Sequence, residues 1–122
     1  MKILLVDDDP DMLLIVSVIL KKIGGFEVIM TDSGRNALVL AETESPDIIL
    51  MDYMMEDMDG PALLEELRRR ESLQTIPVIF LTALSNSFEL ENLYQLGAKG
   101  VIRKPFHPDS LVPEIQRILG SM

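Results

Sequence analysis

The sequence predicts an α/β domain with a doubly wound, five-stranded parallel sheet. Five short apolar runs, rich in Ile, Val and Leu and without polar alternation, have the pattern of strands buried on both faces. Segments with helical spacing lie between them, and this alternation favours a parallel sheet covered by helices on both faces. Right-handed crossovers leave only doubly wound strand orders. The predicted strands are Ile3–Val6, Val28–Met30, Ile48–Met51, Val78–Leu81 and Val101–Ile102.

Capping and turn residues delimit five predicted helices. Ser33 is suited to cap the second helix, and Pro61 fits the first turn of the third. Gly24, Gly97 and Gly120 stand where the first, fourth and fifth helices are expected to end. The predicted helices are Asp11–Ile23, Arg35–Glu44, Pro61–Arg70, Ser87–Leu96 and Ser110–Leu119.

The predicted start of the last helix depends on Pro113. Proline has no backbone N–H, so it is tolerated in the first turn of a helix but breaks or bends the interior. We therefore expect this helix to begin near Ser110 rather than at Pro108, or else to be kinked.

Length and composition indicate one globular domain over residues 1–122. A chain of this size buries about two thirds of its surface on folding, which is enough for a hydrophobic core. The absence of cysteine excludes disulfides, thiolate metal sites and cysteine nucleophiles. A single histidine, His107, argues against a His-based zinc site or a Ser-His-Asp triad.

The net charge and the hydropathy of the sequence indicate where in the cell the protein is expected and which partners are unfavourable. Twenty acidic and eleven basic residues give a net charge of −9, which repels nucleic acid and anionic membranes. No direct contact with either is therefore expected. The N-terminal apolar run is followed at once by acids, unlike a signal peptide, and no run approaches the ~18 residues of a membrane span. The sequence is expected to be cytoplasmic.

Polar residues follow four of the predicted strands where the strands end. In open parallel sheets this edge is where ligands bind. Asp9 has an ordinary explanation as the cap of the first helix, with Pro10 in its first position. Each of the others also has an ordinary interpretation when taken singly, but their coincidence at one edge favours a site. The residues are Asp7, Asp8 and Asp9 after the first strand, Asp52 after the third, Thr82 after the fourth and Lys104 after the fifth.

Carboxylates grouped in this way repel one another, so either one is protonated or a cation lies among them. Carboxylate oxygens suit Mg²⁺, which keeps several of its waters. An aspartate can act as a nucleophile toward phosphorus. Lys104 and Thr82 would then neutralise and hydrogen-bond the phosphoryl oxygens.

Six short motifs span nearly the whole chain, and together they are highly specific. They are LLVDDD at Leu4–Asp9, DIILMD at Asp47–Asp52, MDG at Met58–Gly60, FLTA at Phe80–Ala83, GAKG at Gly97–Gly100 and KPF at Lys104–Phe106. In these motifs the sequence resembles the receiver domain of bacterial two-component response regulators.

The resemblance implies a flavodoxin-like (βα)5 fold with strand order 2-1-3-4-5 and a metal site at its edge. It implies that Asp7, Asp8 and Asp52, with the backbone carbonyl of Met54, hold Mg²⁺, with Mn²⁺ as an alternative. Glu56 stands where the family usually has proline, so the loop around it is expected to be less rigid.

The resemblance also implies the roles of the phosphoryl-binding residues. Asp52 is expected to be the phosphoacceptor, Lys104 to bind the phosphoryl group and Thr82 to be the switch hydroxyl. The Lys104–Pro105 peptide is expected to be cis. The expected donor is a phosphohistidine on a sensor histidine kinase or a phosphotransfer protein. The expected readout is a changed face of the fourth helix, fifth strand and fifth helix, for a separate partner or a covalently linked effector domain. Val101 stands where an aromatic switch residue is common.

Three other functions are less compatible with the sequence. Aspartyl-phosphate phosphatases of the haloacid-dehalogenase type carry a second Asp at the position of Met54. No glycine-rich phosphate-binding motif follows the first strand, which argues against a nucleotide-binding module. A docking receiver that works without phosphorylation is disfavoured by the complete set of site residues. Catalysis is expected to extend no further than the protein's own phosphorylation and dephosphorylation, so the protein is not expected to be an enzyme.

Overall fold

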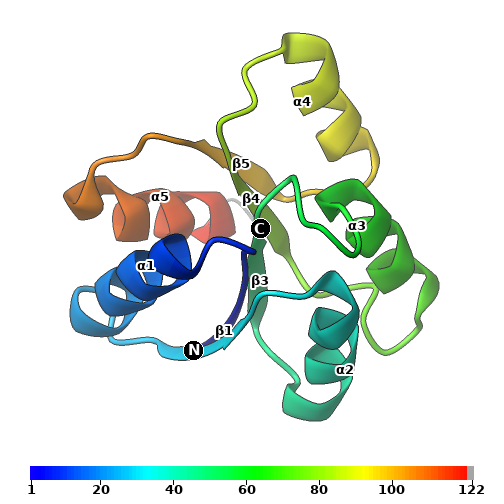
Figure 1. Cartoon of the computed structure of the whole chain (residues 1–122), viewed down its shortest axis with the longest axis horizontal. Coiled ribbons are helices and arrows are strands. Elements are labelled where there is room, and N and C mark those ends of the chain that lie inside the picture. The colour runs from blue at the N-terminus through cyan, green and yellow to red at the C-terminus, as the bar shows by residue number, and fades with distance from the viewer. Residues whose placement is uncertain (121–122) are drawn as a thin grey trace.

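The computed structural model describes residues 1–120, in which five strands alternate with five helices (Figure 1). The strands are β1 (Lys2–Val6), β2 (Glu27–Thr31), β3 (Ile48–Met51), β4 (Val78–Thr82) and β5 (Gly100–Arg103). The helices are α1 (Pro10–Lys22), α2 (Gly34–Glu44), α3 (Gly60–Arg69), α4 (Ser87–Gln95) and α5 (Pro108–Gly120).

All strand pairs in the sheet are parallel, and their order is β2-β1-β3-β4-β5, as expected. Val6 at the end of β1 is in register with Thr31 of β2 and Met51 of β3. Met51 is in turn in register with Phe80 of β4. The carboxyl ends of the three central strands therefore meet at one edge.

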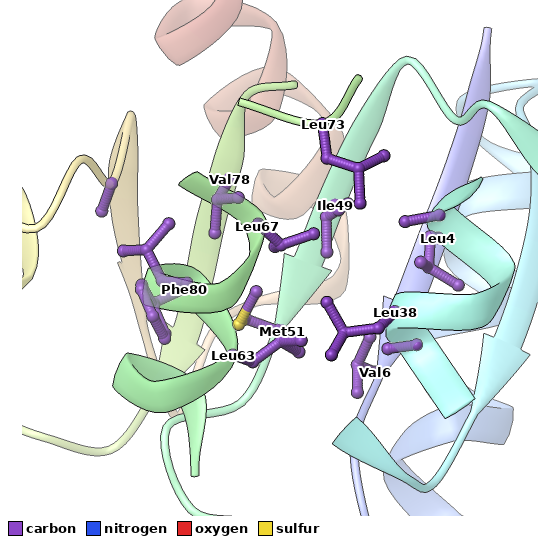
Figure 2. Close-up of a cluster of buried hydrophobic side chains, with 14 of the residues drawn as sticks. Leu4, Val6, Leu38, Ile49, Met51, Leu63, Leu67, Leu73, Val78 and Phe80 are labelled. Atoms are coloured by element: carbon purple, nitrogen blue, oxygen red, sulfur yellow. The ribbon is translucent and has the colours of Figure 1, made fainter. Parts of the chain in front are cut away.

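Helices cover both faces of the sheet. α1 and α5 pack on one face, and α2, α3 and α4 lie on the other (Figure 1). Figure 2 shows the core on the second face, where Leu63 and Leu67 of α3 and Leu38 of α2 project onto the sheet. Burial of these apolar side chains from both layers is the main favourable contribution to folding.

All predicted ends of helices and strands lie within two residues of those observed. Asp9 and Ser33 cap α1 and α2 as expected, each accepting a hydrogen bond from a backbone N–H of the first turn. Gly97 has a φ of 113°, which glycine adopts without strain. None of the helices formed by residues 1–120 has the length and hydropathy that a bilayer crossing requires.

The predicted start of α5 at Ser110 is wrong. The helix begins at Pro108 and contains Pro113 in its interior. Both the backbone N–H and the hydroxyl of Ser110 donate to the carbonyl of His107, which closes the first turn. Buried side chains on either side of Pro113, among them Leu111 and Ile115, hold the segment on the sheet and outweigh the lost N–H. Gly120 lies within the helix rather than after it.

Candidate functional site

Three aspartates meet at the carboxyl edge of the sheet. Asp7 and Asp8 follow β1, and Asp52 follows β3. The N–H of Asp52 donates to the carbonyl of Val6 at 3.0 Å, which holds the ends of the two strands together. One carboxylate oxygen from each of the three aspartates lies within 4.8 Å of the others. Asp7 is buried, Asp52 half-buried and Asp8 exposed, so the group opens to solvent on one side.

Lys104, which follows β5, brings a positive charge to this group. Its Nζ lies 3.3 Å from Asp7 Oδ2 and 3.6 Å from Asp52 Oδ1. Its backbone N–H donates to the carbonyl of Thr82 at 2.8 Å, which extends the β4–β5 pairing as far as the lysine. The Lys104–Pro105 peptide is cis, as predicted.

The site carries more negative than positive charge. Burial raises the pKa of Asp52, and the charges of Asp7 and Asp8 raise it further. The ammonium of Lys104 and a hydrogen bond from the N–H of Tyr53 act in the opposite direction. One ammonium among three carboxylates leaves an excess of negative charge, and the donors are all hard oxygens. The residues present therefore fit a divalent cation such as Mg²⁺.

A shallow hollow opens beside Asp52. The hydroxyl oxygen of Thr82, a residue only 3% exposed, accepts a hydrogen bond from the N–H of Leu84 at 3.1 Å. This bond leaves the hydroxyl hydrogen free to donate elsewhere. The structure thus brings the predicted phosphoacceptor, switch hydroxyl and lysine to one hollow. Its lining residues are Asp52, Tyr53, Met54, Thr82, Ala83, Leu84, Glu89 and Lys104.

Glu89 was not anticipated from the sequence. It lies in the first turn of α4 and lines the hollow. Burial raises the pKa of Tyr53, and the charges of Glu89 and Asp59 raise it further. A helical pattern shows which side of α4 is polar, but not where that side is placed relative to another strand. An acid in the first turn of a helix, seven residues after the end of a strand, is too common to be a signal by itself.

Gly60 allows close packing of the polypeptide next to Asp52. A Cβ at this position would overlap the ring of Phe80 and lie 2.7 Å from the carbonyl oxygen of Asp52. The N–H of Gly60 donates to the carbonyl of Tyr53 at 2.7 Å, which closes the loop that follows Asp52. The glycine of the MDG motif therefore allows the start of α3 to approach Phe80 of β4 and the backbone of Asp52.

In the metal-free protein, Asp52→Asn is expected to raise the unfolding temperature at neutral pH. Because the pKa of Asp52 is raised above its value of 3.8 in the unfolded chain, the folded protein binds the proton more tightly. The free energy of unfolding therefore falls as pH rises between the two values, and above them the ionised carboxylate costs stability that asparagine does not.

Thermal unfolding of both proteins in chelator, from about pH 4 to pH 8, checks this expectation. The advantage of the variant should shrink as the pH falls. A difference that stays constant over the range would contradict an electrostatic origin.

Comparison with known proteins gives consistent matches over almost the whole chain. Residues 3–116 match the family model described as response regulator receiver domain. The chain is 34% identical over 118 residues to the alkaline phosphatase synthesis transcriptional regulatory protein PhoP of Bacillus subtilis (strain 168). It is 32% identical over 118 residues to the response regulator Rre1 of Synechocystis sp. (strain ATCC 27184 / PCC 6803 / Kazusa). These alignments cover 97% of this chain but 48% and 51% of the two relatives, so the chain spans about half their length.

Solved structures show the same architecture. The chemotaxis response regulator CheY4 of Vibrio cholerae superposes with a TM-score of 0.89 at 31% identity, covering 96% of this chain and 97% of that chain. The receiver domain of the sensor histidine kinase PA1611 from Pseudomonas aeruginosa PAO1 has a TM-score of 0.86 at 33% identity. That comparison covers 98% of this chain and 97% of the other, whose structure has a magnesium ion coordinated in its active site cleft.

Proposed function

Because this chain belongs to the response regulator receiver domain family, we propose that it is a signalling switch operated by phosphorylation of Asp52. The observation that carries the proposal is the placement of the Asp52 carboxylate. It lies 3.6 Å from the ammonium of Lys104 and within 4.8 Å of carboxylate oxygens of Asp7 and Asp8, beside a hollow that Thr82 also lines. Residues 1–122 constitute a single receiver domain in this proposal.

Asp7, Asp8, Asp52 and the backbone carbonyl of Met54 would hold the metal ion, Mg²⁺ or alternatively Mn²⁺. The excess negative charge and the oxygen-only donor set support this assignment. When bound, such an ion neutralises charge on phosphoryl oxygens during transfer. The magnesium seen in the PA1611 receiver domain, a relative of the same fold, adds support.

The remaining chemistry belongs to three side chains. An oxygen of the Asp52 carboxylate attacks phosphorus of a phosphohistidine on a sensor histidine kinase or phosphotransfer protein. The P–N bond breaks, and its electron pair stays on the imidazole nitrogen. The Lys104 ammonium stabilises charge on the transferring group, and the Thr82 hydroxyl donates to one of its oxygens.

Incubation with acetyl phosphate and Mg²⁺, followed by intact mass measurement, tests the proposal. The wild-type chain is expected to gain the mass of one phosphoryl group, whereas Asp52→Asn and wild type in chelator should gain none. Equal labelling of Asp52→Asn would overturn the assignment of Asp52. An unlabelled wild-type protein would instead favour a docking receiver, and continued release of phosphate from unrelated phosphomonoesters would indicate a phosphatase.

The proposed output is a change in the face formed by α4, β5 and α5. Phe88 is 79% exposed and Tyr94 50% exposed on α4, so both are available to a partner. Val101 on β5 packs against the core cluster and is too short to swing as an aromatic ring would. The partner is either a separate protein or an effector domain in the same polypeptide, and the chain spans about half the length of the curated relatives it matches. The net charge of −9 makes direct contact of this domain with nucleic acid unfavourable.

Beryllofluoride, a phosphoryl mimic, is expected to shift NMR signals of residues 83–94 most strongly while Val101 keeps one side-chain rotamer. New acceptor oxygens at Asp52 should draw the Thr82 hydroxyl inward and move the loop that joins it to α4. Backbone and methyl spectra with and without the mimic check this, with Asp52→Asn as control. Shifts confined to α1 and α2 would contradict this output face.

A further inference from the structure

The carboxylate of Asp57, in the loop between β3 and α3, binds the N-terminus of α2. It accepts hydrogen bonds from the Ser33 hydroxyl at 2.7 Å, from the Gly34 N–H at 2.9 Å and from the Arg35 N–H at 3.1 Å. The first amides of a helix have no partner within the helix and carry the positive end of its dipole, so a carboxylate is favoured there. These hydrogen bonds favour the ionised form and lower the pKa of Asp57 to about 2.

The backbones of the loop and the helix also approach closely. A Cβ on Gly34 would lie 3.0 Å from the Cβ and 3.0 Å from the carbonyl oxygen of Met58. Such contacts are tighter than side chains normally make, so the absence of a side chain at Gly34 allows the loop to reach the helix. The contact between Asp57 and α2, called the junction below, therefore combines three hydrogen bonds with close packing of the two backbones.

Hydrogen bonds connect this junction to the proposed metal ligands. The N–H of Asp7 donates to the carbonyl of Thr31 at 3.2 Å, and the hydroxyl oxygen of Thr31 accepts from the N–H of Ser33 at 3.2 Å. The Ser33 hydroxyl then donates to Asp57. From Asp57 the chain itself leads back to Asp52. The N–H of Asp52 in turn donates to Val6, the residue before Asp7. The hydrogen bonds and the polypeptide therefore form a closed ring that includes Asp7 and Asp52. In this ring the Asp57 carboxylate joins the β3–α3 loop to the start of α2.

The rest of the loop has other anchors. Its base is closed by the hydrogen bond between Tyr53 and Gly60, and the side chains of Met55 and Met58 pack on the core. Within residues 1–120, the hydrogen bonds that join this loop to α2 all end on Asp57. Glu56 stands where the family usually has proline, whose ring would restrict φ. The backbone at position 56 therefore lacks this restriction.

We propose that Asp57 is a positioning residue for the metal site: by fixing the loop to α2 it holds the Met54 carbonyl in place for Mg²⁺. This inference rests on the proposed function, because it takes Met54 as a ligand. The hydrogen bonds between Asp57 and the start of α2 restrain the loop, in which no proline restricts the backbone at position 56.

Titration calorimetry of Mg²⁺ on the full chain tests the inference in wild type, Asp57→Ala, Asp57→Asn and Glu56→Gln. Glu56→Gln is the matched control. Glu56 and Asp57 line one surface hollow together with Asp8, Asp32 and Ser33, so the change removes a negative charge there without removing a hydrogen bond of the junction. We expect Asp57→Ala to weaken Mg²⁺ binding by about 10- to 100-fold, as loss of residues that orient metal ligands usually does. Asp57→Asn, which keeps one acceptor oxygen, should lie between.

Two further measurements separate positioning from general destabilisation. Hydrogen exchange at the Gly34 and Arg35 amides should accelerate in Asp57→Ala, and its phosphorylation rate should return to the wild-type value when Mg²⁺ is saturating. Ser33→Ala, a milder change on the other side of the junction, should weaken Mg²⁺ binding in the same direction.

This inference alone would be overturned if Asp57→Ala and Glu56→Gln bound Mg²⁺ with equal affinity while the wild type bound Mg²⁺ and became phosphorylated. A lower unfolding temperature without a change in Mg²⁺ affinity would do the same. Wild-type protein that binds no Mg²⁺ would overturn the proposed function together with the inference.

Discussion

Lys104→Met is expected to slow phosphorylation of the protein by on the order of 10²–10³-fold at saturating Mg²⁺. The ammonium lies 3.6 Å from Asp52 Oδ1 in a half-buried site, where a charge that stabilises the transferring group has a large effect. Its loss also removes a cation that lowers the pKa of Asp52. The rate of labelling by acetyl phosphate, followed by mass, measures the effect.

Mg²⁺ affinity distinguishes this effect from damage to the metal site. Lys104→Met removes a positive charge that competes with the metal ion, so Mg²⁺ is expected to bind at least as tightly as in wild type. Lys21→Met, a change of the same type at an exposed position on α1, should leave the rate unaltered. A Lys104→Met protein that is phosphorylated at the wild-type rate would remove Lys104 from the proposed mechanism.

Phe80→Ala is expected to lower the free energy of unfolding by about 3–5 kcal/mol. The ring is fully buried in β4, in the cluster that Figure 2 shows between the sheet and α3, and it occupies the space next to Gly60. Removing it leaves a cavity that the strands on either side cannot fill by moving. Urea unfolding followed by circular dichroism gives the value.

Phe88→Ala provides the matched control for Phe80→Ala. The same side chain is removed, but Phe88 is 79% exposed on α4, and the expected change is within about 0.5 kcal/mol. Equal losses in the two variants would show that the burial described here does not govern stability.

The predicted elements follow from local patterns, and their observed ends show the limit of such patterns. β4 runs on to Thr82 and β5 to Arg103, each beyond its apolar run, because hydrogen bonds of the sheet continue where hydrophobicity stops. In α5 the preference of Pro113 for a first turn predicted a later start. Burial of Leu111 and Ile115 against the sheet outweighed that preference, and the burial of a helix face is not visible in any single residue.

The candidate site was predictable to the extent that it depends on strand ends. Parallel strands in register bring the residues after β1 and β3 together, so the meeting of Asp7, Asp8 and Asp52 follows from the sheet alone. Thr31 follows the same rule at the end of β2, yet its place in the hydrogen bonds to Asp7 and Ser33 was not anticipated.

The sequence by itself determined the fold class and the acids, hydroxyl and lysine at the sheet edge, because alternating periodicity and strand-end position are properties of short segments. Only the tertiary structure decided that Glu89 faces the hollow and that Asp57 binds the start of α2. Both contacts join segments from separate βα units across loops. Their geometry depends on where each helix docks on the sheet, and side chains from both layers of the core set that docking together.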